Sequence, residues 1–105
     1  MKYIKTFEGL NNKEPKIGDY VICTTEDQTA PGLKEFSEHT IGKCIKNEIF
    51  VVTIQYDYVP SEILYTNFDS TGKLPTRWMT KDDILYFSPN KEDLEIYIDS
   101  DKYNL

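Results

Sequence analysis

The chain is poor in the residues that metal and redox sites require, with only two cysteines and one histidine among 105 residues. Structural zinc sites take four ligands and usually include a C-x-x-C pair, which this sequence lacks. Cys23 and Cys44 are therefore expected to be reduced, buried thiols that act as small hydrophobes. Two alternatives stay open, a redox or metal-binding cysteine pair and a nucleophilic pair of His39 with Cys44. We expect no cofactor, no metal and no catalytic residue.

Long apolar runs are also absent. No segment reaches the length of a membrane span, and residues 1–10 lack the apolar core of a secretory signal. We therefore expect a cytoplasmic protein, in the producing cell or in a host cell, with no membrane partner.

Basic residues are few, with 12 Lys and Arg against 18 Asp and Glu and a net charge of −6. Nucleic-acid phosphates attract clustered Lys and Arg, so direct nucleic-acid binding is not expected. A strong bias to Lys, Asn, Ile, Tyr, Asp and Glu is typical of an AT-rich coding genome.

The stretch from Thr40 to Tyr58 has the pattern of a β-hairpin. From Phe50 onward every second residue is apolar or aromatic, which is the period of a strand with one buried face. That face is predicted to hold Phe50, Val52, Ile54, Tyr56 and Tyr58. A shorter strand at Ile41–Ile45 and a polar turn at Lys46–Glu48 are expected before it. Gly42 predicts a bulge or the close approach of another backbone.

The rest of the chain supplies shorter elements around this hairpin. They are a strand at Tyr20–Cys23, a helical turn at 33–38, a loop at 67–76, a closing strand at 84–87 and a helix at about 90–98 that Asn90 caps. Ile63, Leu64 and Tyr65 are expected to pack into the core. Residues 1–7 are predicted to form an edge strand or an ordered arm.

The order of these elements resembles the small SH3-like barrels of KOW and Tudor type. The resemblance is carried by Gly18-Asp19 before the first strand, Ile41-Gly42-Lys43 at the second, a third strand directly after it, and the closing strand Ile84–Phe87. The segments I-G-K-C-I-K and D-D-I-L-Y-F-S-P-N-K-E-D-L-E also resemble short uncharacterised proteins of bacteriophages and large DNA viruses.

This resemblance covers about residues 16–98 and implies a mainly β fold. The expected architecture is a small SH3-like barrel of about five antiparallel strands with a short C-terminal helix. Residues 1–105 would form one domain, with the barrel at about 16–88. The resemblance implies no catalytic residue.

One group of aromatic residues lies near predicted loops and is the first candidate for a binding surface. SH3-like barrels commonly use aromatics at loop mouths to hold peptides, methylated cations or bases. The candidate residues are Tyr58, Tyr65, Phe68, Arg77 and Trp78. The alternative is core filling and edge packing, which Trp78 fits least because it lies beside Arg77 in a polar segment.

The C-terminal quarter of the chain carries most of the negative charge. Residues 80–105 contain seven acidic and three basic side chains, for a net charge of −4. Glu92, Asp93 and Glu95 could imitate phosphate charge on a host protein, or simply form a solvated helix face. Asp82 and Asp83 lack the spacing of a calcium loop; the other carboxylates considered with them are Asp57, Glu62 and Asp69.

The sequence thus predicts a non-enzymatic binding module that recognises a protein or peptide through its aromatic surface. It would be encoded by a phage or another mobile element. The first alternative is an acidic inhibitor of anti-defence type that mimics nucleic acid on a host protein. A small enzyme or metal protein ranks behind both.

Overall fold

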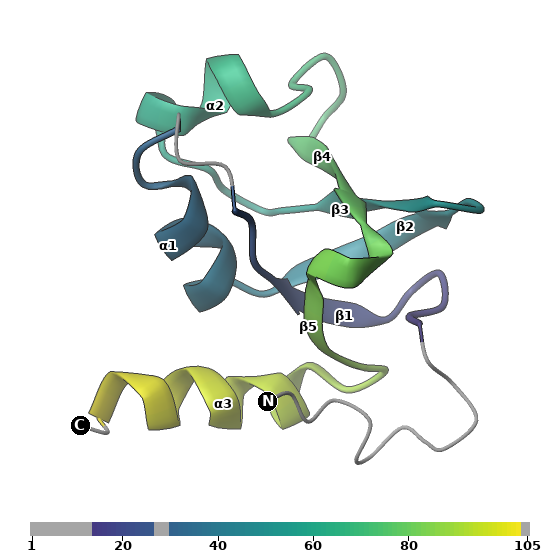
Figure 1. The fold of residues 1–105 in the computed structure, drawn as a ribbon, viewed down its shortest axis with the longest axis vertical. Coiled ribbons are helices and arrows are strands. Elements are labelled where there is room, and N and C mark those ends of the chain that lie inside the picture. Colours follow the sequence, from purple (N-terminus) through teal and green to yellow (C-terminus); the bar gives the residue numbers. More distant parts are fainter. Residues whose placement is uncertain (1–13, 27–29, 104–105) are drawn as a thin grey trace.

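The computed structural model describes residues 14–26 and 30–103, and the predicted edge strand or arm at residues 1–7 lies outside these ranges. The chain forms one five-stranded antiparallel sheet in the order β4-β3-β2-β1-β5 (Figure 1). The strands are β1 (Tyr20–Cys23), β2 (Gly42–Asn47), β3 (Val51–Gln55), β4 (Thr76–Thr80) and β5 (Ile84–Ser88). The helices are α1 (Leu33–His39), α2 (Ser61–Asn67), the 3₁₀ turn η2 (Lys81–Asp83) and α3 (Lys91–Tyr103).

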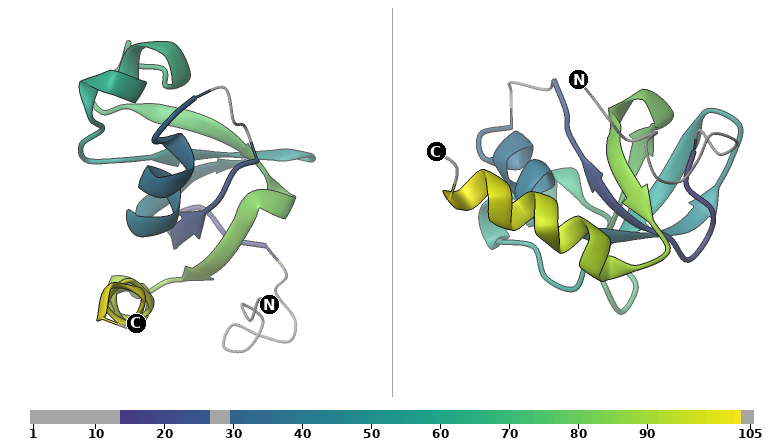
Figure 2. Two further views of the ribbon diagram at one scale, coloured as in Figure 1. Left: turned by 60° about the vertical axis from the view of Figure 1, so that its left-hand side comes forward. Right: turned by 90° about the horizontal axis from the view of Figure 1, so that it is seen from below.

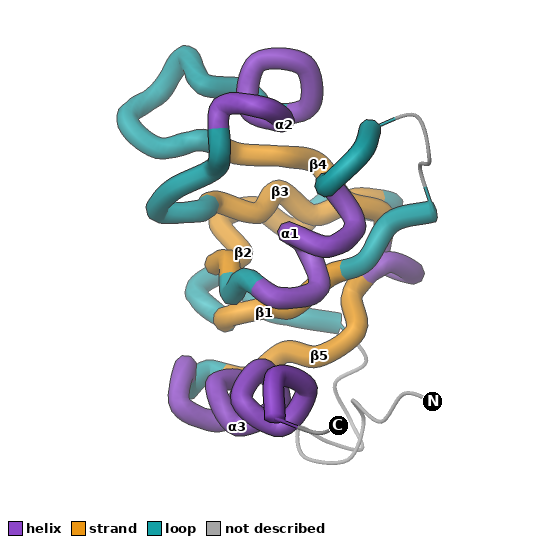
Figure 3. The backbone as a smooth tube through the Cα atoms, turned by 90° about the vertical axis from the view of Figure 1, so that its left-hand side faces the viewer, coloured by secondary structure: helices purple, strands orange, loops and turns teal. Residues whose placement is uncertain are grey.

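The predicted five antiparallel strands and the C-terminal helix are confirmed, and the helix continues beyond Ile98 to Tyr103. The sheet does not close into a barrel, because its two edge strands, β4 and β5, do not pair with each other within the described residues. Figure 2 shows α3 running along one end of the sheet. In Figure 3, α1 covers one face of the sheet, while α2 lies beyond β4 and α3 lies beyond β5.

The predicted hairpin is present, but its turn lies further along the chain than expected. A register shift between Cys44 and Lys46 adds a residue to β2, which therefore extends to Asn47. The turn falls at Glu48–Phe50, where the Glu48 N–H donates to the Val51 carbonyl over 2.9 Å.

The predicted buried face of the hairpin is correct only in its middle. Val52, Ile54 and Tyr56 are buried, whereas Phe50 is 81% exposed and Tyr58 is 71% exposed. Both exposed residues lie outside the strand, since β3 begins at Val51 and ends at Gln55. The alternation of side chains between faces holds only while the backbone stays in the ladder.

Gly42 is a site of close approach, as predicted, but side chains rather than another backbone approach it. A Cβ atom at this position would lie 2.4 Å from Cγ2 of Ile54 and 2.8 Å from Cε1 of Tyr56. The glycine therefore leaves room for the Tyr56 ring to lie across β2 inside the core.

Three aromatic rings join the helices to the sheet. Phe36 of α1 and Tyr56 meet edge to face with centroids 5.1 Å apart, and Phe68 contacts both rings at 5.9 and 5.8 Å. Leu33 anchors the start of α1 in the same core, which confirms the predicted helical turn. Such edge-to-face pairs favour one fixed arrangement of the rings.

The segment after Pro60 forms the helix α2, for which the sequence pattern gives no prediction. Ile63 is buried and Leu64 packs against the core, but Tyr65 is 75% exposed, so the prediction that Tyr65 packs inside is wrong. A helix of two turns can turn only part of its surface to the core.

The start of α3 is held by a buried serine of β5. Ser88 Oγ donates to Asp93 Oδ2 over 2.6 Å and accepts from the Asn90 N–H over 3.1 Å. Further along, Leu94 is buried and Tyr97 stacks on Tyr86 with centroids 4.2 Å apart. These contacts fix α3 against the β5 edge of the sheet.

Candidate functional site

Trp78 is the most prominent feature of the surface formed by β4. The sequence predicts a loop here, but Trp78 lies at the centre of a strand and pairs with Thr53 of β3. Its side chain is 74% exposed, while that of its neighbour Met79 is buried on the opposite face of the sheet. The indole is therefore carried on a regular strand with its backbone position fixed by pairing.

A shallow hollow of about 360 Å³ lies next to this indole. It is lined by Asn67, Asp69, Thr76, Arg77 and Trp78. The Asp69 carboxylate, which is ionised at neutral pH, accepts hydrogen bonds from the N–H and Oγ1 of Thr71, and these bonds lower its pKa. The hollow thus offers an aromatic wall and a fixed negative charge.

Arg77 holds the structure around Trp78 and is not a freely exposed side chain. Its Nη1 donates to the backbone carbonyl of Asn67 over 3.0 Å, and its Cζ lies 5.9 Å from the centroid of the Phe68 ring. Phe68 itself is only 9% exposed and belongs to the core. Of the five candidate residues, these two therefore support the surface from beneath.

Tyr58 and Tyr65 are exposed, but neither lines the hollow beside Trp78. Tyr58 borders a separate groove of about 540 Å³ between α1 and α3, together with His39, Lys91 and Glu95. It also borders a hollow of about 280 Å³ that contains Leu64, Lys73 and Pro75. Tyr65 lies on α2. The predicted single aromatic surface is thus divided between the β4 side and the Tyr58 side.

The tip of the β2–β3 hairpin carries a second exposed apolar feature that the sequence prediction missed. Ile49 and Phe50 are adjacent, and both side chains are largely exposed. Two consecutive apolar residues next to a turn cannot both face the core of a half-buried strand, and this signal was available in the sequence.

The two cysteines are free and fully buried, as expected. Burial raises the pKa of Cys23 to about 12, with a smaller contribution from the Asp83 carboxylate. Burial also raises the pKa of Cys44, whose thiol points to the Lys46 carbonyl at 3.6 Å. Thiols with raised pKa values are protonated at neutral pH and are poor nucleophiles.

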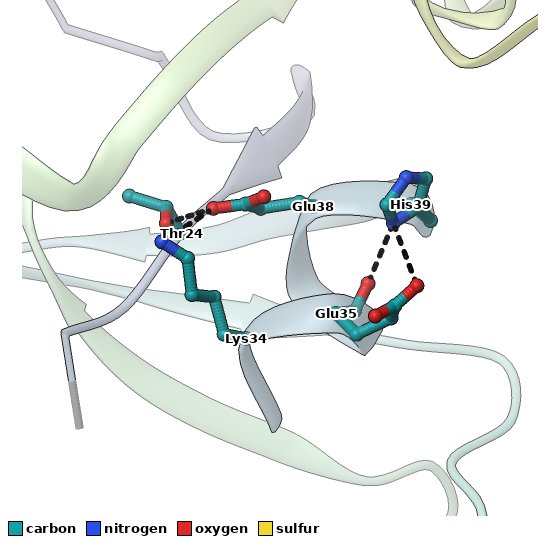
Figure 4. Close-up of polar contacts among 5 residues, drawn as sticks. All are labelled: Thr24, Lys34, Glu35, Glu38 and His39. Carbon is teal, nitrogen blue, oxygen red and sulfur yellow. Dashed lines mark hydrogen bonds and ion pairs between the residues drawn. The ribbon is translucent and has the colours of Figure 1, made fainter. Parts of the chain in front are cut away.

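His39 is engaged by its own helix, as Figure 4 shows. Its Nδ1 lies 2.9 Å from the Glu35 carbonyl and 4.0 Å from Glu35 Oε2. On the other side of α1, Glu38 accepts from Thr24 Oγ1 and pairs with Lys34 at 3.4 Å. The bond between Thr24 and Glu38 joins α1 to the segment after β1. The contacts of His39 with Glu35 give no support to a pairing of His39 with Cys44.

The three acidic residues predicted as a surface lie on α3, but they differ in exposure and in hydrogen bonding. Glu92 and Glu95 are exposed, whereas Asp93 is half-buried and accepts a hydrogen bond from the Ser88 hydroxyl. Within residues 14–26 and 30–103, no three His, Cys, Asp or Glu side chains are placed to hold a metal ion. No helix in those ranges is long and apolar enough to cross a membrane.

No protein-family model, no curated protein and no solved structure matches this chain.

Proposed function

We propose that the protein is a non-enzymatic binding module that recognises a protein or peptide through a surface centred on Trp78. The observation that carries this proposal is the position of the indole, largely exposed on a paired strand and beside a hollow. A tryptophan side chain has only two torsion angles and so loses little entropy on binding, and tryptophan is among the residues that dominate interface energetics.

The SH3-like relationship, the phage or mobile-element origin and the cytosolic location are further parts of this proposal, and each has its own support. An SH3-like relationship fits the strand order, in which β1 to β4 pair in succession and β5 returns to pair with β1. A phage or mobile-element origin fits the composition and the resemblance of the C-terminal segment. Action in the cytosol fits two buried, free thiols.

Trp78→Ala is the variant that tests the proposal, and Phe50→Ala is its matched control. Phe50 is at least as exposed as Trp78 but lies at the hairpin tip. The immobilised wild-type protein and both variants would be incubated with a host-cell extract, and captured proteins would be quantified by mass spectrometry. Proteins retained by wild type and Phe50→Ala but lost by Trp78→Ala support the proposal.

Tyr58→Ala and Tyr65→Ala extend the test to the rest of the predicted surface. Since Tyr58 borders other hollows, its removal is expected to affect capture less than removal of Trp78. Capture that survives Trp78→Ala unchanged for every protein would show that the surface on β4 is not the binding site.

The acidic inhibitor is a second proposal, supported by the face of α3. Glu92, Glu95 and Asp99 are exposed and follow one another at spacings of three and four residues, so they share one side of the helix. At 1.5 Å of rise per residue, they spread over roughly 10 Å. A row of carboxylates of this kind could meet a basic nucleic-acid site on another protein.

Neutralising these three carboxylates to glutamine or asparagine tests the inhibitor proposal separately. Asp93 is left unchanged, because it accepts a hydrogen bond from Ser88 at the start of α3. Binding to a nucleic-acid-handling protein should weaken in the triple variant and with added salt, and Trp78→Ala should leave it intact. Binding that is insensitive to both salt and the triple substitution would eliminate this function.

A further inference from the structure

Within residues 14–26 and 30–103, one side of the β4 backbone has no neighbouring strand, because β4 is an edge of the sheet. The Tyr56 N–H donates to the Pro75 carbonyl over 3.0 Å, and this bond sets the alternation along the β3–β4 ladder. The backbone groups that face β3 therefore belong to Pro75, Arg77 and Met79. Those that point away from β3 belong to Thr76, Trp78 and Thr80.

Among the described residues, only Asp69 pairs with this outer edge, at its first position. The Asp69 N–H donates to the Thr76 carbonyl over 2.8 Å, and the Thr76 N–H donates to the Asp69 carbonyl over 3.0 Å. An antiparallel continuation would place Asn67 opposite Trp78, but Asn67 is the last residue of α2 and the helix leads the chain away (Figure 1). Strand pairing at this edge therefore stops after one residue pair.

The backbone at Trp78 and the N–H of Thr80 are thus left available. These groups point away from β3 and make no backbone hydrogen bond to any residue in the described ranges. Native edge strands are commonly protected by charged side chains or proline, but the side chains that share the outer face of β4 are threonine, tryptophan and threonine. The described part of the chain therefore leaves the edge unprotected beside the exposed indole.

We propose that an extended segment of the partner protein adds to the outer edge of β4 as an additional strand. Its backbone would pair with the N–H and C=O of Trp78 and with the N–H of Thr80, and an apolar side chain would cover the indole. Strand addition of this type obtains affinity from main-chain bonds and specificity from side-chain sites. The inference rests on the proposed function and specifies its mode of recognition.

A second copy of this chain is a poorer occupant of the edge. Each copy carries a net charge of −6, so two copies repel each other at moderate ionic strength. A partner segment that is neutral or basic meets no such repulsion, and the ionised Asp69 carboxylate beside Trp78 favours a positive charge near the end of that segment.

Thr80→Pro removes one outward N–H without disturbing the β3 ladder. The φ angle of Thr80 is −74°, which lies within the range of proline, and the preceding residue is in a strand as proline requires. Thr80→Ala is the matched control, because it also removes the threonine side chain but keeps the N–H.

The probe is a set of linear peptides selected on the wild-type protein from a display library, dye-labelled and measured by fluorescence anisotropy. We expect Thr80→Pro to weaken binding at least about fivefold relative to Thr80→Ala, the effect of about one lost hydrogen bond. Trp78→Ala should weaken it further. In the wild-type protein, hydrogen exchange at the amides of Trp78 and Thr80 should slow when peptide is bound.

The outcomes separate this inference from the proposed function. If Trp78→Ala loses the peptide but Thr80→Pro binds as well as Thr80→Ala, and the two amides gain no protection, strand addition is refuted and the proposed function stands. If Trp78→Ala also binds normally, both fail. Sedimentation of the wild type as a dimer that Thr80→Pro dissociates would make a second copy the occupant and overturn the proposal.

Discussion

Arg77 of β4 donates from Nη1 to the backbone carbonyl of Asn67, the last residue of α2, over 3.0 Å. Its guanidinium also lies over the ring of Phe68. The contact ties the end of α2 to the strand that carries Trp78, so the wall of the hollow and the indole are held in one unit. Arg77, which the sequence predicts as a binding residue, thus also joins α2 to β4.

Arg77→Lys is expected to lower the free energy of unfolding by about 1–2 kcal/mol, because lysine lacks the planar fork that reaches a carbonyl and covers a ring at once. Urea denaturation measures the change. Lys73→Ala, which removes an exposed cation from the adjacent loop, is the control and should stay within about 0.5 kcal/mol of wild type. Equal effects of the two substitutions would contradict this role of Arg77.

Gly42→Ala is expected to destabilise the protein by about 1–3 kcal/mol, because the new Cβ would overlap Ile54 and Tyr56. Gly72→Ala is the matched control, since a Cβ at Gly72 meets no atom within 4 Å. Thermal and urea unfolding of the pair would measure the difference. A Gly42→Ala protein as stable as Gly72→Ala would show that the Tyr56 ring does not lie across Gly42.

Stability should fall as the pH rises from about 9 toward 12. In the unfolded chain the Cys23 thiol titrates near pH 9.0, whereas burial raises its pKa in the folded protein to about 12. A raised folded pKa contributes stability that is complete below the unfolded pKa and is lost above it. Burial raises the pKa of Tyr56 in the same direction.

Cys23→Ala tests this origin, because it removes one of the titrating groups. Its unfolding free energy should decline less steeply between pH 9 and pH 12 than that of the wild type. Native Cys23 should also resist Ellman's reagent at neutral pH and react only after unfolding. An unchanged slope together with a reactive native thiol would contradict the buried position of Cys23.

Ser88→Ala is expected to cost about 1–2 kcal/mol, because it removes the buried hydroxyl that joins Asp93 to the start of α3. Glu92→Gln, which alters the exposed neighbour of Asp93, should change stability by less than about 0.5 kcal/mol. Thermal unfolding monitored by circular dichroism, to which α1, α2 and α3 all contribute, measures the stability of both variants. If both behave alike, Ser88 does not hold the helix.

The middle of the hairpin could be predicted from sequence because Val52, Ile54 and Tyr56 follow the period of a strand. The ends could not, because an extra residue in β2 displaces the turn, and periodicity does not show where pairing begins. Phe50 therefore lies outside the core despite its place in the pattern.

The candidate site was predictable only in part. The exposure of the Trp78 side chain could be predicted from its polar surroundings. The strand β4 could not, because its five residues lie between polar segments and show no strand pattern. The burial of Phe68 depends on Phe36 and Tyr56, which lie far from it in the sequence, and the contact of Arg77 with α2 depends on where α2 ends. Contacts of this range are set by the fold and leave no local pattern.

The most direct test uses Trp78 as its own reporter, because it is the only tryptophan in the chain. Peptide selected on the wild-type protein would be titrated while indole emission and acrylamide quenching are recorded, with labelled-peptide anisotropy as an independent measure of saturation. The proposed site predicts that emission shifts to shorter wavelength and quenching falls in step with saturation, in both the wild type and Phe50→Ala. Full saturation without any change in emission or quenching would contradict binding at Trp78.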